Sequence, residues 1–232
     1  MEYFIEMDDW MVSFFTLDGK GIAAAVVFGA LIYVFGGQTM GAFFLLVILW
    51  FLLLSGIVTW IGKNRKRAIG VYQRSRSWSN VVANGIVPVF VAIFYHFNLA
   101  AGIIPSYFIV VSYVASVAAI TADKFSSELG VLGGRPYMLM TGRKVKQGTS
   151  GGITAFGFGA GLLGSLLIAI AFLGNSSYPV YLLVVLCAGF LGNVVDSILG
   201  YFEEKEIGNK FTSNFACSFA GWGVSLLLLL LV

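Results

Sequence analysis

Residues 121–152 read TADKFSSELGVLGGRPYMLMTGRKVKQGTSGG, and the segments on either side of them, residues 103–120 and 153–173, carry no charged residue. Uncharged segments of this length are typical of helices that cross a bilayer. The stretch between them gathers carboxylates, cations and glycines at one membrane border. Because carboxylates suit a divalent cation and basic groups suit phosphate, we expect this border to handle a charged ligand.

The composition of the whole chain indicates an integral membrane protein. Of its 232 residues, 59% are hydrophobic and only 11% are charged, whereas soluble domains carry about 25% charged residues. The acidic N-terminus lacks the basic-then-apolar order of a secretory signal. The two cysteines, Cys187 and Cys217, fall inside apolar segments, so neither a disulfide nor a cysteine metal site is expected.

The apolar segments predict an all-α fold, a polytopic transmembrane helical bundle of about seven spans that forms a single integral membrane domain over residues 1–232. Helices are expected because unsatisfied backbone groups are costly in lipid. The predicted spans cover residues 21–36, 40–61, 81–96, 99–121, 153–173, 178–200 and 211–232.

The placement of basic residues supports this division of the chain. Every Lys and Arg lies before the first span or in alternate connections, and the remaining connections hold none. By the positive-inside rule the N-terminus and the loops at residues 62–80, 122–152 and 201–210 are predicted to be cytoplasmic. The net charge of +3 and the short basic patch do not favour nucleic acid as a partner. A homodimer remains open.

Three carboxylates are the predicted catalytic residues and the predicted ligands of Mg²⁺. Asp123 and Glu128 end a predicted helix, where the helix dipole disfavours anions and a bound Mg²⁺ would compensate. The alternative is a solvated helix end with a Lys124–Glu128 pair. Asp196 lies inside an apolar span, where a carboxylate is a functional candidate by default. Its alternatives are a hydrogen bond to a neighbouring helix or a proton relay in a transporter.

A glycine turn and a basic cluster follow the first two carboxylates. The turn at residues 147–152 precedes a span whose N-terminus would bind anions through its backbone N–H groups. Glycines also serve in ordinary tight turns, so the turn alone is a weak signal. The predicted nucleotide-binding and phosphate-binding residues are Asn80, Asn84, Lys124, Arg143, Lys144, Lys146, Gly148, Thr149, Gly151, Gly152 and Asn214.

The basic loop at residues 63–80 has two interpretations. Most of its cations, Lys66 among them, are explained by topology and by attraction to anionic lipid headgroups. Arg74 and Arg76 lie nearer the next span, and we predict that one of them contacts the acceptor phosphate. Asn80 and Asn84 lie four residues apart on one helix face, where they could bind a ligand or form interhelical hydrogen bonds.

Together these elements are the parts that phosphoryl transfer needs. A metal bridges the nucleotide phosphates, while cations and N–H groups stabilise the moving charge. The apolar bulk of the chain suggests that the second substrate is a lipid that enters from the side.

Four motifs in order, WSNVVANG (78–85), ADKFSSELGVL (122–132), TGRKVKQGTSGG (141–152) and LGNVVDSILG (191–200), resemble those of the phytyl-phosphate kinase family of integral membrane proteins. The resemblance extends from about residue 18 to the C-terminus. It implies a membrane kinase that converts an isoprenyl monophosphate, such as phytyl or geranylgeranyl phosphate, into the diphosphate. It further implies a nucleoside triphosphate donor, CTP in the first instance, and Mg²⁺ as cofactor.

The resemblance can be carried over position by position. The matching residues are Asn80, Asn84, Asp123, Ser127, Glu128, Gly130, Thr141, Gly142, Lys144, Gly148, Thr149, Gly151, Gly152, Asp196, Ser197 and Asn214. The chain departs from the family pattern at Lys124 and Phe125, where a Thr and a Trp are usual, which leaves the role of Lys124 open.

Two other functions fit the same sequence. A membrane CTP-dependent cytidylyltransferase would transfer CMP to an isoprenoid lipid and release pyrophosphate. A lipid or solute transporter would use Asp196 as a coupling carboxylate. The expected location is the cell membrane, with the site facing the cytoplasm.

Overall fold

The protein is a bundle of membrane-length helices, as the apolar segments predict. The computed structural model describes residues 17–72, 77–173 and 178–232. Five described helices are long and apolar enough to cross a membrane, and a sixth, α6, is shorter and apolar. The helices are α2 (Gly19–Trp60), α3 (Lys63–Ala68), α4 (Trp78–Ala101), α5 (Ser106–Gly130), α6 (Ala155–Leu173), α7 (Pro179–Glu203) and α8 (Lys210–Leu229).

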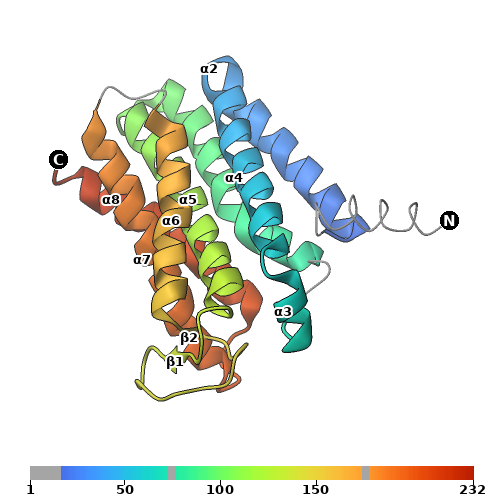
Figure 1. Cartoon of the computed structure of the whole chain (residues 1–232). Helices are drawn as coiled ribbons and strands as arrows, with labels where there is room; N and C mark the ends of the chain where they lie inside the picture. The colour runs from blue at the N-terminus through green and yellow to red at the C-terminus, as the bar shows by residue number, and fades with distance from the viewer. Residues whose placement is uncertain (1–16, 73–76, 174–177) are drawn as a thin grey trace.

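Helix α2 folds back on itself and supplies the first two predicted spans. Gly37 has φ 66° and ψ −168°, a conformation that only glycine adopts readily, and it separates two helical arms. The arms meet closely at the turn, since a Cβ on Gly41 would lie 2.2 Å from the carbonyl oxygen of Tyr33. Figure 1 shows the two blue arms side by side. With the arms counted separately, the described residues contain seven apolar helical segments, which confirms the predicted number.

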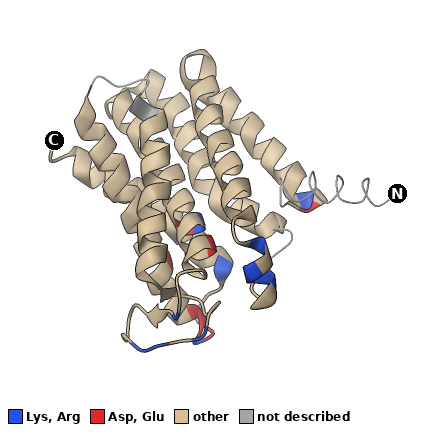
Figure 2. Cartoon of the chain, viewed as in Figure 1, with Lys and Arg blue, Asp and Glu red and all other residues tan. Residues whose placement is uncertain are grey.

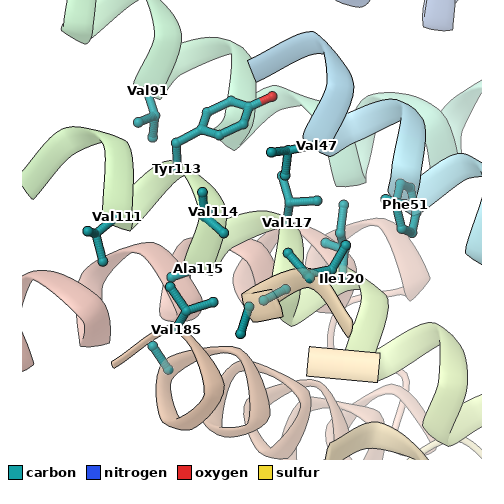
Figure 3. Packing of buried hydrophobic residues seen from close by; sticks show 14 of the residues in the cluster. Val47, Phe51, Val91, Val111, Tyr113, Val114, Ala115, Val117, Ile120 and Val185 are labelled. Atoms are coloured by element: carbon teal, nitrogen blue, oxygen red, sulfur yellow. The ribbon is translucent and has the colours of Figure 1, made fainter. Parts of the chain in front are cut away.

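Helix α5 forms the centre of the bundle. In its most apolar stretch 89% of the residues are buried, against 39–44% for the other candidate spans. Its side chains pack against α2, α4 and α7, as Figure 3 shows for Val47, Val91 and Val185. Tyr113 lies in this core and donates a hydrogen bond of 2.7 Å to the backbone oxygen of Phe44. Its hydroxyl therefore connects the central helix to the second arm of α2.

The central helix is longer at its C-terminal end than the sequence predicts. The fourth predicted span stops at residue 121, whereas α5 continues to Gly130. Asp123 and Glu128 lie on the last turns of α5, which agrees with their predicted place at a helix end, although the predicted span stopped two residues before Asp123. The connection that follows contains a two-stranded antiparallel sheet of β1 (Tyr137–Met138) and β2 (Gly152–Ile153).

The charged residues gather at one end of the bundle. Figure 2 shows the Lys, Arg, Asp and Glu residues of the described ranges near the C-terminal ends of α5 and α7, around α3, along the β1–β2 connection and at the start of α2. This distribution agrees with the alternating charge pattern of the sequence. The end of the bundle that carries the β1–β2 connection is called the charged end below.

Candidate functional site

Asp196 and Lys210 form an ion pair at the charged end. The Lys210 ammonium donates to both carboxylate oxygens of Asp196, at 3.0 Å to Oδ1 and 2.9 Å to Oδ2. The Asp196 side chain is only 7% exposed, while that of Lys210 is 47% exposed. A buried carboxylate is thus held by a cation that can reach the membrane border.

Asp123 belongs to the same cluster. Its charge acts on the Lys210 ammonium, together with that of Asp196. Asp123 comes from α5, Asp196 from α7 and Lys210 from the first turn of α8, so three helices meet here. Its carboxylate also accepts a hydrogen bond of 3.3 Å from the Ser127 hydroxyl. The structure therefore brings together two of the three predicted catalytic carboxylates.

Lys210 was not among the predicted site residues. In the sequence it served only as one of the basic residues whose placement predicts the topology. Its position in the sequence was a signal. A lysine in the first turn of a helix is disfavoured by the helix dipole, and a nearby carboxylate would compensate for this. The turn itself is set by Asn209, whose side chain accepts from the backbone N–H groups of Phe211 and Thr212. This capping box fixes where α8 begins and hence where Lys210 lies.

Glu128, the third predicted carboxylate, lies in a different ion cluster. Its Oε2 accepts from the Lys66 ammonium at 2.7 Å, and its Oε1 accepts from the Lys124 ammonium and from the Thr59 hydroxyl. Lys66 and Lys124 are only 1% and 2% exposed. The Lys124–Glu128 pair that the sequence left as an alternative is therefore present, with a buried lysine and a partly buried carboxylate rather than a solvated pair.

Lys66 has a structural role that topology alone does not explain. Besides Glu128, its ammonium contacts the backbone oxygens of Val58 and Thr59 at 3.1 and 3.2 Å. These carbonyls belong to the last turn of α2, where a cation satisfies acceptors that the helix leaves open. The expectation that Lys66 faces lipid headgroups is wrong, because this side chain is buried between α2 and α5.

The predicted three-carboxylate metal site is not assembled. Among the residues that the structure describes, no group of three or more His, Cys, Asp or Glu side chains could hold a metal ion. The physical reason is that the charge of Glu128 is balanced by two buried ammonium groups. Asp123 and Asp196 remain as a pair of carboxylates, and one or two carboxylates with substrate phosphates are the usual ligands of Mg²⁺.

The glycine turn is docked on the end of α7. Gly151 has φ 72°, and a Cβ there would lie 2.6 Å from the backbone oxygen of Ser197 and 2.6 Å from the backbone nitrogen of Tyr201. Ser150 donates from its N–H to Glu204 at 2.8 Å and from its hydroxyl to Glu203 at 2.6 Å. The turn therefore connects the loop to the helix that carries Asp196.

Some of the backbone groups that the sequence assigned to phosphate form hydrogen bonds within the turn. The N–H groups of Thr149 and Gly152 donate to the backbone oxygens of Lys146 and Thr149. The N-terminus of α6 is capped by a side chain. The Thr154 hydroxyl accepts a hydrogen bond of 2.9 Å from the N–H of Gly157 and donates one to the backbone oxygen of Gly130. In this structure the N–H groups of Thr149, Gly152 and Gly157 are thus bonded within the protein.

The basic residues of the loop lie on its outer side. Arg143, Lys144 and Lys146 are exposed, and the Lys144 ammonium lies 5.8 Å from the centre of the Tyr137 ring. Gln147 anchors the loop by donating to the backbone oxygen of Val131 at 2.9 Å. The three cations are therefore free to approach a ligand in solution, but they do not line the Asp196 cluster in this conformation.

Two of the three predicted asparagines contact each other beside that cluster. Asn84 is buried, and Asn80 accepts a weak hydrogen bond of 3.5 Å from the Nδ2 of Asn214. Asn214 lies one helical turn beyond Lys210, and its Oδ1 is buried without a hydrogen-bond partner among the described residues. An open acceptor at this position can take a donor from a ligand. Arg74 and Arg76 lie outside the described residues.

Comparison with known proteins identifies the family. Residues 9–221 match the family model described as integral membrane protein DUF92. The chain is 34% identical over 221 residues to the uncharacterized membrane protein MJ0933 of Methanocaldococcus jannaschii, a match that covers 91% of this chain and 85% of that protein.

Two plant proteins are also similar. The chain is 32% identical over 208 residues to Protein VTE6, chloroplastic, and 30% identical over 188 residues to Protein PGR, both of Arabidopsis thaliana. These matches cover 85% and 66% of this chain, but only 60% and 62% of the plant proteins. No solved structure matches. The chain therefore belongs to the integral membrane protein DUF92 family, in agreement with the resemblance of its motifs.

Proposed function

We propose that the protein is a membrane kinase that transfers the terminal phosphoryl group of a nucleoside triphosphate, CTP in the first instance, to an isoprenyl monophosphate. The observation that carries this proposal is the cluster of Asp123, Asp196 and Lys210 at the charged end of a multi-pass bundle. Membership of the DUF92 family and the similarity of the chain to Protein VTE6 support it.

The cluster provides both kinds of charge that phosphoryl transfer requires. Two carboxylates on different helices would hold Mg²⁺ together with the nucleotide phosphates, and the ion would supply neutralisation of the phosphate charge. Lys210 now neutralises these carboxylates, and its half-exposed side chain can turn toward a phosphate oxygen when another cation takes its place. Lys210 would then stabilise the negative charge on the transferred group.

The proposed reaction needs no strong base. An oxygen of the acceptor monophosphate, already anionic, attacks the γ-phosphorus of the nucleotide. The bond between that phosphorus and the β,γ-bridging oxygen breaks, and the bridging oxygen leaves with the electron pair as part of the nucleoside diphosphate. The products are an isoprenyl diphosphate and the nucleoside diphosphate. The protein contributes orientation and charge stabilisation, as in other phosphoryl transfers.

The other predicted site residues bind substrates or position the catalytic residues in this proposal. Lys144 and Lys146 would bind the nucleotide phosphates from the outer side of the loop, and Arg74 or Arg76 would meet the acceptor phosphate. Glu128 holds Lys66 and Lys124 and thereby fixes the end of α5 on which Asp123 lies. We assign Glu128 to positioning rather than to the metal.

A labelling experiment tests the proposal. The purified full chain in nanodiscs is incubated with Mg²⁺, γ-labelled CTP or ATP and a panel of isoprenyl alcohols and monophosphates. Label in an isoprenyl diphosphate is the expected result, and the preferred donor names the nucleotide. Asp196→Asn should be inactive. Lys205→Ala should keep full activity, because Lys205 is an exposed cation that lies over the Tyr201 ring.

The same experiment separates the alternatives. Label found only in pyrophosphate, with a CDP-lipid formed, would establish a cytidylyltransferase instead. Absence of turnover with every pair, together with nucleotide-independent flux through proteoliposomes, would establish a transporter. A cell-membrane location with the charged end toward the cytoplasm is part of the proposal, and accessibility of a cysteine introduced at Lys205 from one side of sealed vesicles tests it.

A further inference from the structure

The two arms of α2 border a groove that lies outside the two ion clusters described above. Two hollows, of about 80 and 670 Å³, lie against this hairpin and share six lining residues. We call this the α2 groove and define it by the shared residues, which are Leu17, Ala25, Gly29, Leu45, Leu49 and Leu52. Glycine and alanine on the first arm leave the space that the leucines of the second arm border.

The outer side of the α2 groove is apolar and open. The larger hollow is lined only by aliphatic residues, glycine and one tyrosine. Several of them present much of their surface, with Val26 66% and Leu49 47% exposed. In a bilayer this surface faces hydrocarbon, so the groove is open to a molecule that diffuses in the membrane plane.

The inner side of the α2 groove ends in polar groups. The smaller hollow also touches Ser55, Asn80 and Asn84, which are the polar residues of its lining. Asn80 contacts Asn214 at 3.5 Å, and Asn214 lies one turn from the lysine that holds Asp196. The groove therefore leads from the lipid phase to the edge of the carboxylate cluster.

The shape of the groove limits what can occupy it. An α-helix with its side chains is about 10–12 Å across. Not even one turn of such a helix would fit in the inner hollow, whose volume is about 80 Å³. The ring of Phe28 packs tightly against Gly85, where a Cβ would lie 2.4 Å from the ring, and both residues line the inner hollow. The space admits a single slender chain with a small polar head at the asparagine end.

We propose that the α2 groove binds the isoprenoid chain of the lipid substrate, with the phosphate head at Asn80 and Asn84. This inference rests on the proposed function for the identity of the head group. It adds the place where the chain lies and the side from which the substrate enters. A single-chain monophosphate matches both the apolar length of the groove and its polar end.

Photoaffinity labelling tests the site without requiring turnover. The probe is geranylgeranyl monophosphate with a diazirine at the chain terminus, applied to the full chain in nanodiscs and mapped by mass spectrometry. Label is expected on the α2 residues that line the groove, and excess geranylgeranyl phosphate should displace it. Excess phosphatidic acid should not, because its two chains do not fit.

A matched pair of variants sharpens the test. Gly29→Leu fills the groove, and the variant should fold because a Cβ there meets Leu45 at an ordinary 3.4 Å. We expect labelling to fall about tenfold, which corresponds to the loss of part of one buried chain. Leu183→Phe changes a lipid-facing residue of α7 that is 56% exposed, and it should leave labelling unchanged.

The outcomes are distinct from those of the kinase assay. Label in the groove without any phosphoryl transfer would uphold this inference and reject the kinase. Turnover with label confined to α7 or α8, or equal displacement by phosphatidic acid, would overturn the groove assignment alone. A photocrosslinker placed at Leu49 that captures residues 1–16 or a second copy of the chain, in place of lipid, would also overturn it.

Discussion

Replacement of Glu128 by glutamine tests whether this carboxylate is structural or catalytic. The side chain contacts the ammonium groups of Lys66 and Lys124, which are 1% and 2% exposed. Removing one partner of a buried ion pair costs about 3–5 kcal/mol, because the opposite charge loses its compensation in a medium of low dielectric. Two ammonium groups share this carboxylate, so we expect Glu128→Gln to reach that range even though glutamine keeps one acceptor oxygen.

The loss should be visible as a lower melting temperature. For a chain of this size, 1 kcal/mol shifts the midpoint by about 2–4 °C, so the expected decrease is on the order of 10 °C. Tryptophan fluorescence during heating in detergent measures it, and size-exclusion chromatography confirms that the variant is folded at low temperature. Turnover below the transition should persist, because Asp123 and Asp196 are untouched.

A triple variant provides the control. Lys66→Met, Lys124→Met and Glu128→Leu together replace the ion cluster by apolar side chains, and such replacements are often neutral or stabilising. The triple variant should therefore regain most of the melting temperature that Glu128→Gln loses. The reasoning fails if Glu128→Gln melts within about 2 °C of the parent protein but has no activity, since Glu128 would then act in catalysis.

Three further outcomes are expected. Asp196→Asn should abolish turnover yet lower the free energy of unfolding by no more than about 1 kcal/mol, because Lys210 is half exposed and can be solvated; activity assays and melting curves measure the two effects, and retained activity would reject the role of Asp196. Gly151→Ala should destabilise by about 1–3 kcal/mol from its left-handed backbone alone, and by more because its Cβ would meet α7. Gly142→Ala has a similar φ of 65° and open space around the Cβ, so it should show only the backbone cost, and equal melting temperatures for the two variants would contradict the docking of the turn. Lys144→Ala should raise the KM for the nucleotide several-fold, as expected for one exposed phosphate contact of about 1 kcal/mol, and should leave the melting temperature unchanged; a lower melting temperature with unchanged KM would make it structural.

Much of the fold could be predicted from the sequence because membrane insertion depends on local composition. Uncharged runs gave the helical segments, and alternating basic connections grouped their ends correctly. Gly37 is an example of a limit, since the short run Gly36–Gly37–Gln38–Thr39 between two apolar segments does not reveal that the arms touch at the turn. The predicted span ended too early because the charges at residues 123–128 do not suit hydrocarbon, although Glu128 pairs with Lys124 on the same helix and with the distant Lys66.

The candidate site was predicted only in part, because its ion pairs join residues that are far apart in sequence. The intrahelical Lys124–Glu128 pair was foreseeable from its spacing of four. The contact from Lys66 to Glu128 spans 62 residues and closes only when α2 and α5 pack. Lys210 and Asp196 belong to consecutive helices, yet their bidentate geometry depends on the cap at Asn209. Composition and spacing do not encode such contacts.

The tight turn of α2 has a consequence for how the protein enters the membrane during synthesis. The connection around Gly37 holds glycines, Gln38 and Thr39 but no charged side chain. Its transfer through the hydrocarbon layer therefore carries no large electrostatic cost, in contrast to a connection that contains lysine or arginine. The two arms can cross as one preassembled unit, before the remaining helices have left the ribosome.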